Sequence, residues 1–110
     1  MARSLDFDKL VAELVDLQLR HRGLKLSDIA LILGIREDHV RKINSVSSNK
    51  RYTLEHLYLL SNHWNCPLEN FIPNIENIVS LERYRHFNAT ERLDVISKIK
   101  TELRGDEKYE

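Results

Sequence analysis

The sequence predicts an all-α protein, and three observations support this prediction. Successive stretches repeat apolar residues every three to four positions, which is the spacing of a helix with one buried face. The glycines and prolines fall at the ends of these stretches. Convincing strand patterns of alternating apolar and polar residues are absent. At 110 residues the chain fits one domain that can bury a core of its own.

The first predicted helix covers residues 5–21. Its apolar positions recur on one side, and Gly23 suits the left-handed backbone conformation that ends a helix. The side chains expected on the buried face are Leu10, Val11, Leu14, Val15 and Leu17.

Two short helices are expected next, over residues 27–33 and 37–44. Ser27 is the expected N-cap of the first, and Gly34 permits a tight turn between them. The expected core side chains of this part are Ile29, Ala30, Ile32, Leu33, Ile35, Val40 and Ile43.

Residues 45–52 are polar and without period, so we predict a loop. Thr53 is the expected N-cap of a fourth helix that ends near Trp64. Pro67 can open a short fifth helix, and Pro73 stops it. The expected core side chains here are Leu54, Leu57, Leu60, Trp64, Leu68, Phe71 and Ile72.

Residues 75–86 and 90–104 are two further helical candidates, and the tail after them is expected to fray. We therefore divide the chain into a domain at 1–73 and a C-terminal helical extension at 74–110. The second candidate helix carries an apolar stripe. This stripe either folds back on the first helix or pairs with its copy in a homodimer. It consists of Leu93, Ile96, Ile99 and Leu103.

Composition excludes several classes of protein. Lysine and arginine number 17, as do aspartate and glutamate, so the chain is not a strongly basic domain. Residues 36–51 nevertheless hold five basic side chains against two acids, so one face can be basic. No run approaches the ~20 apolar residues that span a bilayer, and no secretion signal is recognisable. We expect a cytoplasmic protein.

Catalytic and metal-binding motifs are not found. There is no glycine-rich phosphate loop and no nucleophile motif, so we expect no enzyme activity, cofactor or small-molecule ligand. Cys66 is the single cysteine, which rules out an internal disulfide, and we expect it to pack as a small hydrophobe. The five histidines lack paired ligand spacing.

Several residues occur in an order that is typical of one family. Ile29 and Ala30 stand shortly before Gly34, apolar residues follow at Ile35 and Val40, and the run KRYTLEHLYLLSNHWNCPLENFIP comes after the loop. With these features, residues 7–73 resemble the Cro and phage-repressor type of helix-turn-helix regulators. The resemblance implies a five-helix, lambda-repressor-like domain. It also implies sequence-specific binding of double-stranded DNA by a bacterial or phage-encoded transcriptional regulator.

The resemblance also implies roles for individual residues. In this family the third helix enters the major groove. Positions that match base-facing sites are Glu37, Asp38 and Lys42, with Arg41 beside them. Positions placed to meet phosphates are Arg36, Ser45, Lys50 and Arg51. A second basic cluster, which includes Arg22 and Lys25, either contacts phosphates or complements the end of the first helix.

Two departures from the family pattern support a rival hypothesis. Leu26 stands where the family usually has a polar residue that touches a phosphate, and the predicted recognition helix begins with two acids, Glu37 and Asp38. The acids can accept from cytosine N4, or they can simply stabilise the helix dipole by about 0.3 to 1 kcal/mol each. The rival is a protein-interaction module on the same fold, accessory or antitoxin-like, that does not bind DNA.

Overall fold

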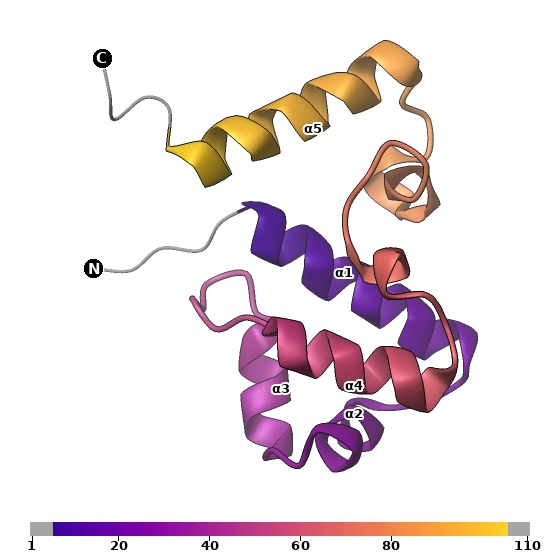
Figure 1. Ribbon diagram of the computed structural model, residues 1–110, viewed down its shortest axis with the longest axis vertical. Coiled ribbons are helices and arrows are strands. Elements are labelled where there is room, and N and C mark those ends of the chain that lie inside the picture. The colour runs from indigo at the N-terminus through magenta and orange to yellow at the C-terminus, as the bar shows by residue number, and fades with distance from the viewer. Residues whose placement is uncertain (1–5, 106–110) are drawn as a thin grey trace.

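The computed structural model describes residues 6–105, and within them the chain is helical with no strand (Figure 1). The predicted all-α class is therefore confirmed. Leu5, at the start of the first predicted helix, and the predicted frayed tail after Gly105 lie outside the described residues. The α-helices are α1 (Asp6–His21), α2 (Leu26–Leu33), α3 (Glu37–Ile43), α4 (Leu54–Trp64) and α5 (Ala89–Arg104). Three short 3-10 helices are η1 (Leu68–Phe71), η2 (Ile78–Ser80) and η3 (Glu82–Tyr84).

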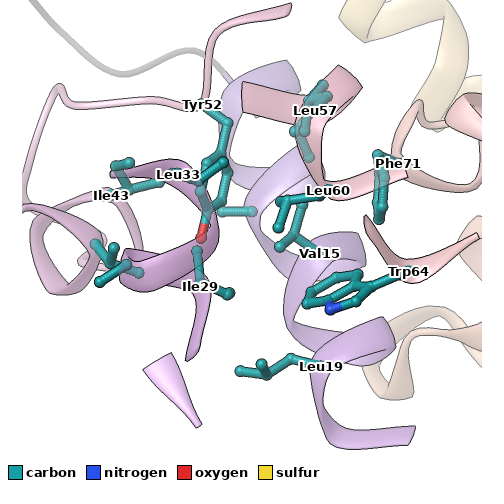
Figure 2. Packing of buried hydrophobic residues seen from close by; sticks show 14 residues of the cluster. Val15, Leu19, Ile29, Leu33, Ile43, Tyr52, Leu57, Leu60, Trp64 and Phe71 are labelled. Atoms are coloured by element: carbon teal, nitrogen blue, oxygen red, sulfur yellow. The ribbon is translucent and has the colours of Figure 1, made fainter. Parts of the chain in front are cut away.

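Helix α1 lies between two groups of elements (Figure 1). One face packs with α2, α3, α4 and η1 around a large core that includes Val15, Ile29, Leu60 and Phe71 (Figure 2). The opposite face packs with the C-terminal part of the chain in a smaller cluster. That cluster consists of Leu10, Leu14, Leu81 and Ile99. The apolar residues of α1 thus serve both cores.

Left-handed glycines end α1 and α2, as the sequence predicts. Gly23 follows α1 with φ 66°, and Gly34 follows α2 with φ 68°. An added Cβ at Gly34 would meet nothing within 4 Å, so only the backbone conformation requires glycine there. The turn after Gly34 carries the chain into α3, which packs closely against α2.

The N-terminus of α4 is capped by Thr53, as predicted. The Thr53 hydroxyl accepts a hydrogen bond from the His56 backbone N–H at 3.2 Å. In return, the Thr53 N–H donates to His56 Nδ1 at 3.1 Å. His56 therefore takes the place that glutamate or glutamine has in a capping box, and it can accept this bond only when Nδ1 is unprotonated.

Acid should weaken this cap. The pKa of His56 is lowered from 6.5 by burial and by nearby His39, against a smaller opposite effect of Glu55. The folded chain thus favours neutral His56. Its contribution to stability is complete above the unfolded pKa of about 6.5 and is lost as pH falls from that value through the lower folded pKa. We expect the urea concentration at the unfolding midpoint to be lower at about pH 5.5 than at about pH 7.5. The decrease should be smaller in a His56→Gln chain. An equal fall in both chains would contradict this role.

The predicted start of α2 is wrong by one residue. The helix begins at Leu26 with Lys25 at the N-cap, so Ser27 does not cap it. The reason is Asp28, whose carboxylate reaches back to accept the Lys25 N–H at 2.8 Å. This bond gives the N–H group of the N-cap residue a hydrogen-bond partner, although no hydroxyl caps the helix.

The helix predicted over residues 75–86 is also wrong, since this segment holds only η2 and η3. Asn74 and Asn77 each accept the backbone N–H of the other, at 2.7 and 2.9 Å. Asn77 Nδ2 also donates to the Ile72 carbonyl at 2.7 Å. Such side-chain bonds offer the backbone an alternative to the α-helix.

Core predictions at six residues are corrected. Leu54 was expected in the core but is 65% exposed, whereas Tyr52 in the preceding loop is buried. Tyr52 lies beside Ile43 and Leu33 (Figure 2) and belongs to the large core. Four further residues predicted to be buried lie only partly buried against the large core, namely Ile32, Ile35, Leu68 and Ile72. Leu17 is likewise only partly buried, against the smaller cluster.

Candidate nucleic-acid interface

Helix α3 has one buried and one solvent-facing side. Val40 and Ile43 are fully buried against the large core. Because an α-helix completes one turn every 3.6 residues, this orientation makes the charged side chains of α3 point away from the core. The structure therefore brings the four candidate base-contact residues, three at base-facing positions and Arg41 beside them, together on one accessible surface. They are Glu37, Asp38, Arg41 and Lys42.

These four side chains form two ion pairs along the helix. Glu37 Oε2 lies 2.6 Å from Arg41 Nη2, and Asp38 Oδ2 lies 3.8 Å from Lys42 Nζ. In each pair the acid precedes the base by four residues, which is the favourable order in a helix. The acids at the start of α3 therefore hold the cations of its last turn, in addition to complementing the helix dipole.

The ends of α3 carry further cations. Arg36 is the exposed N-cap residue, and its side chain makes no capping bond. Lys50 and Arg51 are exposed in the loop after α3. Arg51 lines the same hollow as Asp8 of α1. Burial raises the pKa of Asp8, and the nearby charge of Arg51 partly offsets this rise. Cations thus lie both before and after α3.

The loop after α3 is held by polar contacts. Ser45 and Ser47 share a hydrogen bond between their hydroxyls at 3.1 Å, and the Lys50 N–H donates to Ser48 Oγ at 3.0 Å. From α1, Lys9 Nζ donates to the carbonyls of Ser45 and Ser48. Lys9 had no predicted role. It lies 36 positions before Ser45 and 39 positions before Ser48, and no local sequence pattern marks contacts over such separations.

Arg22, a predicted phosphate contact, is engaged inside the protein. Its guanidinium lies 5.0 Å from the centroid of the Trp64 ring. It also donates to Gln18 Oε1 at 2.7 Å and to the Trp64 carbonyl at 3.2 Å. These contacts tie the C-terminal ends of α1 and α4 together and agree with the alternative of a cation at a helix C-terminus. Lys25, the other member of this pair, is exposed.

The apolar stripe of α5 is divided between core and surface. Ile99 is 5% exposed and packs with Leu10 and Leu14 of α1, while Ile96 is half-buried against the same cluster. These two residues therefore agree with the alternative in which the stripe folds back on the first helix. Leu93 and Leu103 are 50% and 48% exposed, and they alone of the stripe are largely accessible to another chain.

Other kinds of site find no support among residues 6–105. No group of three or more histidine, cysteine, aspartate or glutamate side chains is arranged to hold a metal ion in this part of the chain. Cys66 is a free thiol, partly buried against the large core. None of the helices described has the length and apolar character needed to cross a membrane.

Comparison with protein families, curated proteins and solved structures finds no match to this chain.

Proposed function

We propose that the chain is a sequence-specific, double-stranded DNA-binding transcriptional regulator with a lambda-repressor-like helix-turn-helix fold. The observation that carries this proposal is the exposed face of α3. A left-handed turn at Gly34 joins α3 to α2, and two buried side chains fix its orientation. A helix presented in this way fits the major groove, which is about 12 Å wide.

The charged face of α3 can supply base contacts. Arg41 and Lys42 can donate to guanine O6 and N7, and Glu37 can accept from cytosine N4. Their ion pairs are solvent-exposed. Exposed pairs of this kind contribute only about 0 to 1 kcal/mol, so exchanging them for base contacts costs little.

The flanking cations supply attraction that does not depend on sequence. Substituting Lys50 and Arg51 together by alanine should weaken binding to every duplex, because fewer counterions are released from the phosphates. In a salt titration of binding, the slope of log affinity against log salt should become shallower by about two. The matched control is a double alanine variant of Lys98 and Lys100, which are exposed on α5 and should leave the slope unchanged.

The wild-type titration on random and genomic duplexes also tests the proposal as a whole. Salt-dependent binding with a preferred sequence would support it. Absence of any salt-dependent binding would contradict it and would leave the protein-interaction module as the better hypothesis.

Specificity should depend on α3 itself. We expect Lys42→Ala to change the preferred sequence and to lose about 1 to 3 kcal/mol of discrimination at one base pair. Selection from a random duplex library, followed by affinity measurements on single-base variants, would reveal the change. A preference identical to wild type would assign Lys42 to its pair with Asp38 alone.

We also propose that the regulator acts as a homodimer. Two copies of α3 about 34 Å apart would read successive major grooves on one face of the duplex. The exposed Leu93 and Leu103 of α5 support this proposal, because they offer apolar surface that the chain's own core does not cover. A chain that sediments as a monomer at tens of micromolar, both free and on DNA, would contradict it.

The interaction module is the second candidate, and one observation favours it. Leu54, Tyr58 and Leu59 are exposed on one side of α4 beside Leu68. Exposed apolar surface of this kind is typical of contacts with other proteins. The DNA titration separates the two candidates, because this surface carries no cation that could neutralise a phosphate.

A further inference from the structure

Lys9 joins α1 to the loop that follows α3. Its ammonium group donates to the Ser45 carbonyl and lies 3.1 Å from the Ser48 carbonyl, and both bonds are partly shielded from water. Bonds from a charged donor are stronger than those between neutral groups. Ser45 follows the C-terminus of α3, where a cation is also favoured by the helix dipole. Figure 1 shows the loop beside the N-terminal half of α1.

Local backbone bonds also shape the loop, since the Ser45 N–H donates to the Lys42 carbonyl at 3.2 Å and the Ser48 N–H donates to the Ser45 carbonyl at 3.3 Å. Val46 is exposed, and the next buried side chain is Tyr52. Between them, the serine hydroxyls connect the anchored carbonyls to Lys50, whose N–H donates to Ser48 Oγ. The two bonds from Lys9 therefore join this locally bonded loop to α1.

We infer that Lys9 is a positioning residue that holds the loop over residues 45–51 so that Lys50 and Arg51 can contact phosphates. Two of the three N–H donors of the Lys9 ammonium group are used by the loop carbonyls, so Lys9 acts through the loop rather than at a phosphate. Binding is tighter when the contacting groups are already ordered, since less conformational entropy is lost on association. This inference rests on the proposed DNA-binding function.

The test compares Lys9→Met with Lys9→Arg, which keeps a cation and several donors. Hydrogen exchange on the free protein should show faster exchange of the amides from residue 46 to residue 50 in Lys9→Met, with the amides of α4 unchanged. Affinity for duplex DNA should fall about tenfold, which corresponds to ~1.4 kcal/mol, with the salt slope unchanged. Lys9→Arg should restore both properties at least in part. The matched control is Lys98→Met, an equal loss of charge on exposed α5.

Each contrary result has a distinct meaning. A salt slope reduced by about one in Lys9→Met alone would place Lys9 at a phosphate and overturn the positioning role. Unchanged exchange in the loop would overturn the anchor itself, whether or not the protein binds DNA. Failure of the wild-type chain to bind any duplex, with faster loop exchange in Lys9→Met, would overturn the function while leaving the loop anchor established.

Discussion

A chain carrying Phe71→Ala should lose about 3 to 5 kcal/mol of unfolding free energy. Phe71 is completely buried, and its ring lies edge-on to Trp64 with the ring centroids 6.2 Å apart (Figure 2). It belongs to η1, a four-residue 3-10 helix that packs against both α1 and α4. A helix this short has little stability of its own, so the Phe71 side chain holds the segment in place.

Urea unfolding followed by fluorescence of Trp64, the single tryptophan, provides the measurement. The matched control is Tyr58→Ala, which removes a similar ring at a position that is 61% exposed. The control should change stability by no more than about 0.5 kcal/mol. Equal losses in the two variants would mean that Phe71 does not fill the core as described.

The sequence predicts the first four helices because their signals are local. Apolar periodicity identifies the buried faces, Gly23 and Gly34 end helices in left-handed conformations, and Thr53 caps α4. The fold is mispredicted where side chains compete with the helical backbone. The paired bonds of Asn74 and Asn77 break the helix expected over residues 75–86.

In the candidate site, too, the features that depend on local sequence are predictable and those that depend on distant contacts are not. Once Val40 and Ile43 are assigned to the core, helical geometry turns Glu37 and Arg41 outward, so the exposed face of α3 is predictable. Contacts between distant parts of the chain are not predictable from local patterns. The stacking of Arg22 on Trp64 joins positions 42 residues apart, and the anchoring of the loop after α3 by α1 was missed for the same reason.

The boundary predicted after Pro73 stays a prediction, and the packing of α1 provides a way to test it. Leu10 and Leu14 of α1 are buried with Leu81 and Ile99 from the C-terminal segment. The same helix supplies Val15 to the large core. Because α1 is shared, loss of the smaller cluster should weaken the whole chain rather than release α5 alone.

Ile99→Ala should therefore cost about 2 to 5 kcal/mol of unfolding free energy and shift two probes together. Far-UV circular dichroism reports all helices, whereas Trp64 fluorescence reports the large core, to which Ile99 does not belong. Coincident transitions at lower urea would indicate one cooperative unit. The control is Thr101→Ala, at an exposed position of the same helix, which should change the midpoint far less. An unchanged Trp64 transition, with helical signal lost earlier, would instead establish residues 1–73 as an independent domain.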